Sequence, residues 1–212
     1  DIRLTNVAID GDSQTLDVAI FGKSYSVRLP LAGAFQVSNA LCALGCVLAS
    51  GGDVAKSIAA LANLKGVPGR LERIGADRNG ALVYVDYAHT PDALETVMTA
   101  LRPHVSGNGR LIVVFGCGGD RDRGKRPIMG ERATVLADVV YVTDDNPRTE
   151  DAATIRAEVL KGAPDAIEIG DRHAAIMTAI QNTRAGDVVL LAGKGHETGQ
   201  IVGERILPFS DQ

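Results

Sequence analysis

The chain has 212 residues, 45% of them hydrophobic and 23% charged, and its formal net charge is −4 with a pI near 5.6. A chain of this length can bury a substantial core without a disulfide framework. Its acidic balance argues against binding to nucleic acid or to an anionic membrane, and no apolar run reaches the length of about 18 residues that a transmembrane helix needs. We therefore expect a small-molecule partner.

The three cysteines, Cys42, Cys46 and Cys117, form no CxxC motif, and their odd number is typical of reduced thiols in a cytoplasmic protein. Cys42 and Cys46 lie four residues apart in an Ala- and Leu-rich segment. We expect both to pack on one helix face, with metal binding or redox chemistry as the alternative. His104 and His173 belong to no motif and are expected at the surface or at helix ends.

Residues 1–30 alternate apolar and polar side chains, and the pairs Gly11-Asp12 and Gly22-Lys23 supply turns. This pattern predicts antiparallel strands joined by short hairpins.

Two helices are predicted to follow, over residues 37–49 and 53–63. Pro68 then stands in a glycine-containing loop, residues 66–70, where both residue types interrupt regular structure. We therefore place a domain boundary near residue 70.

Beyond residue 70, short apolar runs alternate with helical stretches. Continuous apolar runs of this length are typical of parallel strands that are buried on both faces. The predicted strands are residues 82–85, 111–115, 139–142, 166–169 and 188–192. The expected fold class is α/β, with a mostly parallel sheet and helices on both of its faces.

Local signals mark other elements of this half. Thr90 can cap a helix that has Pro91 at its first position, and Asp171 can cap another. Residues 200–209 contain Gly203-Glu204 between two β-like runs, which predicts an antiparallel hairpin at the sheet edge.

Four polar clusters each begin where a predicted strand ends. They are residues 86–89, 116–125, 144–148 and 193–197. Because the carboxyl ends of parallel strands share one rim, where ligands bind, we expect these clusters to form one site. Two of them, residues 116–125 and 193–197, contain glycines, which occur where backbone must approach a ligand closely.

The second cluster partly matches a phosphate-binding loop. Gly119, Gly124 and Lys125 fit the GxxxxGK pattern, but Arg126 occupies the position where Ser or Thr would hold a metal ion. The intervening charged residues are also unsuited to wrapping backbone amides around phosphates. An arginine contact to a carboxylate or phosphate is the favoured interpretation, with a solvated loop as the alternative.

Together these segments resemble the Mur ligases, and within them the UDP-N-acetylmuramoyl-tripeptide synthetases. The resemblance covers most of the chain, in the family's order. The matching stretches are GAFQVSNALCA (33–43), GVPGRLE (66–72), DYAHTPDAL (86–94), GCGGDRDRGKRP (116–127), DDNPRTE (144–150) and GKGHE (193–197). As a set they are highly specific.

The resemblance implies that residues 1–70 are the end of a central ATP-binding domain and that residues 71–212 are a C-terminal Rossmann-like domain. It implies a cytoplasmic, monomeric ligase that uses ATP and Mg²⁺ to join meso-diaminopimelate to UDP-N-acetylmuramoyl-L-alanyl-D-glutamate. The family's ATP loop, metal ligands and carbamylated lysine would precede residue 1. On its own the chain would supply the amino-acid pocket and part of the ATP site, without activity.

Three residues match the family's nucleotide contacts. Arg70 matches an arginine near the ATP phosphates and is the candidate catalytic residue, with an interdomain ion pair as the alternative. Asp86 and His89 match the segment that touches the nucleotide, where a carboxylate can hold ribose hydroxyls and an imidazole can lie near the base. A structural role is the alternative for His89.

The resemblance also implies a pocket for the far end of meso-diaminopimelate, which carries an ammonium and a carboxylate. Such a group calls for an anion and a cation in the protein. The matching residues are Arg121, Asp145, Asn146, Pro147, Arg148, Gly193 and Glu197. Arg148 would bind the distal carboxylate through two N–H groups, and Asn146 would add a hydrogen bond. Glu197 and the Gly193 carbonyl would complete the contacts to the distal amine and carboxylate. The matched set contains no metal ligand, and no role is assigned to Lys194 or His196.

Other functions fit parts of the pattern. A lysine-adding relative would not need Arg148, and a folylpolyglutamate synthase also activates a carboxylate with ATP. A module that binds an amino acid without chemistry is the alternative from a different class. A dinucleotide-dependent oxidoreductase is disfavoured because no GxGxxG motif follows a predicted strand.

Overall fold

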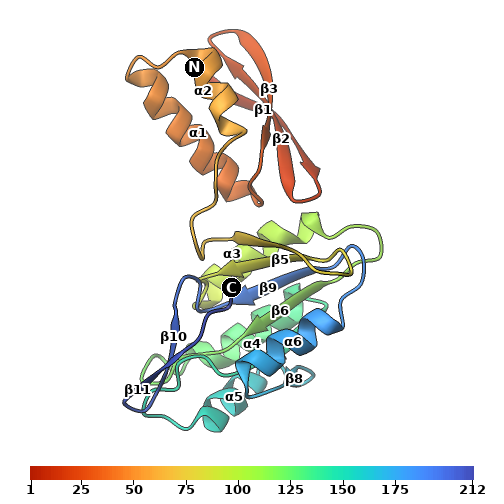
Figure 1. The fold of residues 1–212 in the computed structure, drawn as a ribbon, viewed down its shortest axis with the longest axis vertical. Coiled ribbons are helices and arrows are strands. Elements are labelled where there is room, and N and C mark those ends of the chain that lie inside the picture. Colours follow the sequence, from red (N-terminus) through yellow and green to blue (C-terminus); the bar gives the residue numbers. More distant parts are fainter. The chain divides into compact units, whose positions relative to one another are not determined.

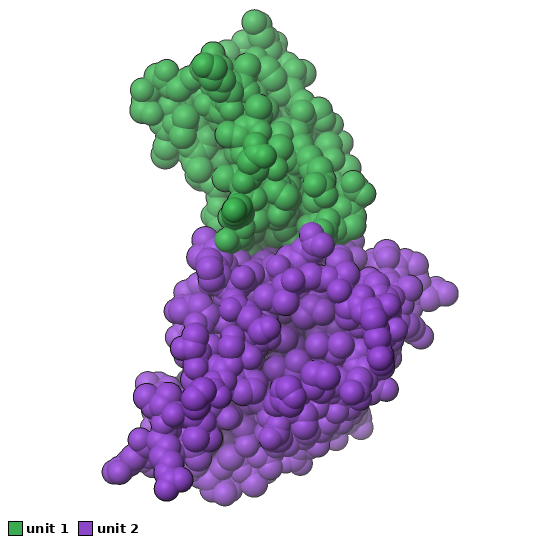
Figure 2. Space-filling view, in the orientation of Figure 1, with its two compact units in different colours: residues 1–66 green, residues 67–212 purple.

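The computed structural model describes residues 1–212 and divides into two compact units, Asp1–Gly66 and Val67–Gln212 (Figure 2). The division falls in the loop where the sequence predicts a boundary. The assignment of residues 1–70 and 71–212 to particular ligase domains stays a prediction. No helix in the described chain is both long enough and apolar enough to cross a membrane.

The first unit begins with an antiparallel sheet in the order β1-β2-β3, as predicted. Its strands are β1 (Ile2–Asp10), β2 (Ser13–Ile20) and β3 (Lys23–Leu29). Gly11 and Gly22 have φ angles of 57° and 80°, which hairpin turns require and glycine adopts without strain. The turn glycines therefore fix the register of both strand pairs.

Two helices, α1 (Ala34–Ala49) and α2 (Val54–Leu61), cover one face of this sheet (Figure 1). Helix α1 begins three residues before its predicted start because Gly33, with φ at 91°, turns the chain into it. Asp53 caps α2 by accepting a hydrogen bond from the Lys56 amide at 2.8 Å. The core contains Leu16, Val18, Ile20, Val27, Leu29, Val37, Ala40, Leu44, Ile58 and Leu61.

The expected packing of Cys42 and Cys46 is wrong. Both thiols are exposed, whereas the buried residues of α1 are Val37, Ala40 and Leu44. At 3.6 residues per turn the two cysteines fall on the opposite side of the helix from these three. Helix α1 has alanines and other apolar residues on both of its sides, so the sequence did not show which side packs against the sheet.

The second unit contains a six-stranded sheet in the order β4-β5-β9-β6-β7-β8. The strands are β4 (Glu72–Ala76), β5 (Leu82–Asp86), β6 (Leu111–Phe115), β7 (Val139–Val142), β8 (Ile167–Glu168) and β9 (Val188–Ala192). Strands β5 to β9 pair in parallel, and β4 is antiparallel at the edge. The predicted α/β class is confirmed. Strand β4 escaped prediction because its residues are mostly exposed and form no apolar run.

Helices cover both faces of this sheet. Helices α3 (Pro91–Leu101), α4 (Lys125–Leu136) and α5 (Ala152–Leu160) lie on one face, and α6 (Arg172–Gln181) lies on the other (Figure 1). The chain crosses the sheet in one direction from β5 to β8 and returns for β9. Because parallel crossovers are right-handed, the return connection must run over the opposite face.

The predicted capping roles of Thr90 and Asp171 are confirmed. Thr90 accepts a hydrogen bond from the Ala93 amide, and Asp171 accepts one from the Ala174 amide at 2.8 Å. His104 is buried at the end of a short 3₁₀ helix after α3, which fits the expected helix-end position and not the surface alternative. His173 is exposed, as expected.

The C-terminal hairpin consists of β10 (Gly199–Val202) and β11 (Arg205–Pro208). It forms a separate two-stranded sheet and not an edge of the main sheet, contrary to the expectation. The reason is its pairing with the loop after β7, since the Arg148 amide donates to the Ile201 carbonyl at 3.0 Å and the Gly203 amide donates to the Arg148 carbonyl at 2.7 Å.

A buried ion pair fixes the C-terminal segment. The Arg172 guanidinium donates to both carboxylate oxygens of Asp211, at 2.7 and 2.6 Å, and to the Ala192 carbonyl at 3.0 Å. Both side chains of the pair have no exposed surface. Removing one member of such a pair leaves the other charge buried without compensation.

We therefore expect Asp211→Ala to lower the free energy of unfolding by about 3–5 kcal/mol, the range for a broken buried pair. Guanidinium denaturation of the wild type and the variant measures the change. Asp165→Ala removes an exposed carboxylate and should change stability by less than about 0.5 kcal/mol. Equal effects from the two variants would refute the structural role of the pair.

Candidate active site

The four polar clusters meet at the carboxyl ends of the parallel strands. Glycines allow the backbones of these clusters to approach one another. A Cβ atom on Gly119 would lie 1.8 Å from the Pro147 carbonyl oxygen, and one on Gly69 would lie 2.2 Å from the backbone nitrogen of His196. The Gly119 amide donates to the Asn146 carbonyl at 2.9 Å. The rim predicted from the sequence therefore exists, and Gly69 and Arg70 join it.

Lys194 lies at the centre of the loops after β7 and β9, and its side chain is fully buried. Its ammonium nitrogen lies 3.4 Å from Asp145 Oδ1, 3.1 Å from Asn146 Oδ1 and 3.1 Å from Glu197 Oε2. A buried ammonium is stable only with such charged and hydrogen-bonding partners. Lys194 therefore joins three of the predicted pocket residues.

Asn146 links the same residues through its amide. Its Oδ1 accepts from the Ile201 backbone amide at 2.9 Å, and its Nδ2 donates to Glu197 Oε2 at 2.9 Å. The backbone of Asp145 is held by the Gln200 side chain, which donates to the Asp145 carbonyl at 2.6 Å. Hairpin β10–β11 thus supports the loop after β7.

Arg148 extends from this loop and is partly exposed. Its backbone has a φ of 53°, a left-handed conformation that is uncommon for a residue with a Cβ atom and that marks a constrained position. One guanidinium nitrogen donates to the Gly119 carbonyl at 2.9 Å and to the Asn146 carbonyl at 3.3 Å. Pro147, which is buried, stiffens the chain before it.

Two further members of the predicted pocket set, Arg121 and Gly193, differ in their exposure and in their hydrogen-bond partners. Arg121 is exposed, and its guanidinium donates to the carbonyl of its neighbour Asp120 at 2.9 Å. Gly193 is buried, and its amide donates to the Asp86 carbonyl at 3.0 Å. The structure therefore groups Asp145, Asn146 and Glu197 tightly, whereas Arg121 makes no contact with them.

Arg126, which breaks the phosphate-loop pattern, has a different partner set. Its buried guanidinium forms ion pairs with Glu150 at 2.9 Å and Glu158 at 2.7 Å, and it donates to the Gly118 carbonyl at 3.2 Å. Hydrogen bonding from Arg126 lowers the pKa of Glu150 from about 4.5 to about 2. Arg126 therefore supports the loop and does not face a ligand.

The predicted nucleotide contacts lie at the other side of the rim. The exposed Arg70 guanidinium carbon lies 4.9 Å from the centre of the Tyr87 ring, and the His89 ring lies 4.7 Å from the same ring. His196 adds a tilted ring at 5.6 Å. This cluster offers an exposed cation and aromatic faces beside one another.

Asp86 is buried beneath this cluster. Its carboxylate oxygens accept hydrogen bonds from the Leu71 amide at 2.6 Å and the Ala88 amide at 2.7 Å. Burial raises the pKa of Asp86 above its usual range, and these two amides and the Arg70 charge oppose the shift. In this structure Asp86 therefore holds the residue that follows Arg70 against the start of the loop after β5.

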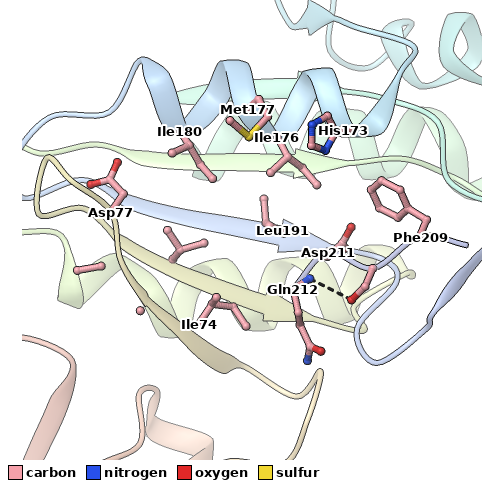
Figure 3. Close-up of a pocket in the computed structure, with 14 residues that line it drawn as sticks. Ile74, Asp77, His173, Ile176, Met177, Ile180, Leu191, Phe209, Asp211 and Gln212 are labelled. Carbon is pink, nitrogen blue, oxygen red and sulfur yellow. Dashed lines mark hydrogen bonds between the residues drawn. The ribbon is translucent and has the colours of Figure 1, made fainter.

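A groove elsewhere, between α6 and the β4 edge, has a volume of about 430 Å³ (Figure 3). Its lining is mainly apolar and includes Ile74, Ile176, Ile180, Leu191 and Phe209. None of the predicted site residues lines it. The polar rim, and not this groove, carries the groups that suit charged ligands.

Sequence reasoning missed four contributors to the rim. Lys194 and His196 belonged to a motif but received no role, Tyr87 was not considered separately from its motif, and Arg126 was seen only as a mismatch to the phosphate-loop pattern. A lysine between two glycines directly after an apolar strand was an available signal, because such a side chain can turn inward at the rim. Its three partners could not be read from the sequence.

A parallel sheet with charged loops gathered at its carboxyl ends defines an α/β ligand-binding domain, and comparison with known proteins shows its family. The family described as "Mur ligase, glutamate ligase domain" matches residues 69–195. A UDP-N-acetylmuramoyl-L-alanyl-D-glutamate–2,6-diaminopimelate ligase of Zymomonas mobilis is 60% identical over 99% of this chain and 44% of its own length. The corresponding ligase of Bradyrhizobium diazoefficiens is 59% identical over 99% of this chain and 43% of its own length.

A solved structure of a ligase with the same name covers all of this chain and 43% of its own chain, with 40% identity and a TM-score of 0.77. The chain belongs to the Mur ligase family. It spans less than half the length of the curated relatives it matches.

The close contact at Gly69 gives one test. We expect Gly69→Ala to destabilise the protein by about 3 kcal/mol or more, because the new Cβ meets the Gly195-His196 backbone and because φ is 66°. Gly107→Ala is the matched control, since its φ is 57° and no atom lies within 4 Å. Denaturant unfolding should show a clearly smaller loss for Gly107→Ala, of about 1–2 kcal/mol.

The Glu150 pKa gives a second test. Its folded pKa, about 2, is below its ordinary value of 4.5, so the stabilisation is complete above about pH 4.5 and disappears as pH falls toward 2. Glu150→Gln should therefore reduce stability at neutral pH, and its difference from the wild type should shrink as acid is added. Urea unfolding across this range measures the difference. A difference that is independent of pH would contradict the assignment.

Proposed function

We propose that this chain is the part of an ATP-dependent amide ligase that binds the incoming amino acid and contributes to the ATP site. The proposed reaction adds meso-diaminopimelate to UDP-N-acetylmuramoyl-L-alanyl-D-glutamate during synthesis of the peptidoglycan precursor. Residues 1–70 would belong to the central ATP-binding domain and residues 71–212 to the C-terminal domain. The names of its relatives and the chemistry of the rim support this proposal.

One arrangement carries the substrate assignment. Glu197 presents a carboxylate, Asn146 an amide and Arg148 a guanidinium at the same rim, and all three are fixed by hydrogen bonds. The far end of meso-diaminopimelate carries an ammonium and a carboxylate, which these groups complement. Lysine lacks the second carboxylate and would leave Arg148 without its ion pair. The same argument disfavours a lysine-adding ligase.

The proposed chemistry begins when ATP transfers its terminal phosphoryl group to the D-glutamate side-chain carboxylate and leaves as ADP. The amine of the amino acid then attacks the acyl carbon. The C–N bond forms, the acyl C–O bond to the phosphate breaks, inorganic phosphate leaves, and the amine nitrogen gives up a proton to solvent. The pocket's part is to hold the amino acid so that the reacting amine lies near the acyl carbon. The exposed guanidinium of Arg70 would stabilise the negative charge that develops on the phosphate oxygens.

The exposed Arg70 and His89 side chains fit part of a nucleotide site, beside the Tyr87 ring. Asp86, with both oxygens already bound to backbone amides, fits a supporting role better than a direct contact to ribose. The described chain has no group of three or more His, Cys, Asp or Glu residues placed to hold a metal ion. The proposed ligase uses ATP with Mg²⁺ and acts as a cytoplasmic monomer.

Two other functions remain as alternatives. A folylpolyglutamate synthase would attach glutamate, which has no ammonium at its far end and would leave Glu197 Oε1 without a partner. A module that binds an amino acid without chemistry would need the same pocket but no ATP. ATP-dependent phosphate release that requires meso-diaminopimelate excludes both alternatives.

Calorimetric titration of this chain with meso-diaminopimelate and with L-lysine tests the pocket. We expect selective binding of meso-diaminopimelate, and we expect Arg148→Ala to weaken it by about tenfold to a hundredfold, the effect of losing hydrogen bonds to a charged group. Arg78→Ala, which removes an exposed arginine in a turn away from the rim, should leave binding unchanged. Equal binding of lysine would overturn the substrate assignment.

If the isolated chain binds neither ligand, the same comparison is made with the intact ligase, by measuring phosphate release. Dependence on meso-diaminopimelate in that assay would support the proposal. Activity with lysine at the same efficiency would contradict it.

A further inference from the structure

Lys194 is a fully buried charged group in the loop after β9, and no role was assigned to it from its motif. It has no exposed surface, whereas its partner Glu197 is 32% exposed. The flanking residues Gly193 and Gly195 have φ angles of 115° and 54°, so the backbone can turn the lysine inward at the end of β9. A buried ammonium is strongly unfavourable unless the protein surrounds it with acceptors.

The acceptors match the three N–H donors of an ammonium group. They are Asp145 Oδ1 at 3.4 Å, Asn146 Oδ1 at 3.1 Å and Glu197 Oε2 at 3.1 Å. Two come from the loop after β7 and one from the loop after β9. The lysine therefore joins two loops that are far apart in the sequence.

This arrangement fixes which atoms of Asn146 and Glu197 remain free. Asn146 Oδ1 accepts from both Lys194 and the Ile201 amide, so the amide nitrogen must face Glu197. Glu197 Oε2 accepts from both Lys194 and Asn146. One proton of the Asn146 amide and the Oε1 atom of Glu197 are thus left for a ligand.

We propose that Lys194 is a positioning residue that sets the selectivity of the amino-acid pocket. It holds Glu197 so that Oε1 receives the distal ammonium of the amino acid, and it holds Asn146 so that the amide proton reaches the distal carboxylate. The inference rests on the proposed function. Because Lys194 is inaccessible, it acts through these two side chains and does not touch the substrate.

The test uses the intact ligase and measures KM and kcat for each substrate. Lys194→Met keeps most of the side-chain volume and removes the charge. We expect the KM for meso-diaminopimelate to rise about tenfold to a hundredfold, as expected for one or two lost hydrogen bonds to charged groups. The KM for ATP and kcat should change less than about twofold. Lys161→Met, at an exposed lysine after α5, makes the same substitution and should change none of these values.

A double variant keeps the inference testable if Lys194→Met does not fold. Lys194→Met combined with Glu197→Gln removes one positive and one negative charge together, which avoids the unpaired carboxylate. If Lys194 acts through Glu197 and Asn146, adding Lys194→Met to Glu197→Gln should raise the KM for meso-diaminopimelate by less than about tenfold, because only the Asn146 route remains. A further rise of about a hundredfold in the double variant would overturn the proposed route.

The outcomes separate this inference from the proposed function. A wild-type ligase that does not prefer meso-diaminopimelate over lysine would refute the proposed function itself. A selective wild type with an unchanged KM in Lys194→Met would refute only the positioning role. A fall in kcat with an unchanged KM would also refute it, because Lys194 would then act in the chemical step.

Discussion

The insertion of β9 between β5 and β6 is the constraint on which the site depends. Parallel pairing aligns Ala192 at the end of β9 with Asp86 at the end of β5 and with Phe115 at the end of β6. Three loops therefore leave the sheet at the same level, and the loop after β7 joins them through the next parallel pair. Strand β9, the last parallel strand along the chain, therefore lies in the middle of the rim. The loop that follows it lies between the loops after β5 and β6.

Buried charges then hold the loops in place from behind. Arg172 pairs with Asp211 and donates to the carbonyl of Ala192, the residue before the loop that carries Lys194. Arg126 plays the corresponding part on the other side, where it pairs with Glu150. Buried pairs of this kind contribute little net stability over apolar residues, but they tolerate few alternative arrangements. They suit a site whose exposed groups must meet a ligand with charges at fixed positions.

Much of the fold was predictable because its signals are local. Apolar runs predicted all five parallel strands, and the capping residues Thr90 and Asp171 marked two helix starts. The edge strand β4 gave no signal, because an exposed antiparallel strand lacks the apolar run that was used to find the others. The expectation that the two cysteines of α1 pack against the core was wrong for a related reason. An Ala-rich helix has apolar residues on both sides, so composition did not identify the side that packs.

The sequence by itself determined the family, the order of the elements and the four polar clusters at strand ends, because these depend on spacing along the chain. The tertiary structure decided the atomic partners. Only the folded chain shows that Lys194 joins Asp145, Asn146 and Glu197, and that Asp86 binds the backbone beside Arg70. Such contacts depend on which strands become neighbours in the sheet. That order is set by packing and crossover handedness between distant segments, and no local pattern records it.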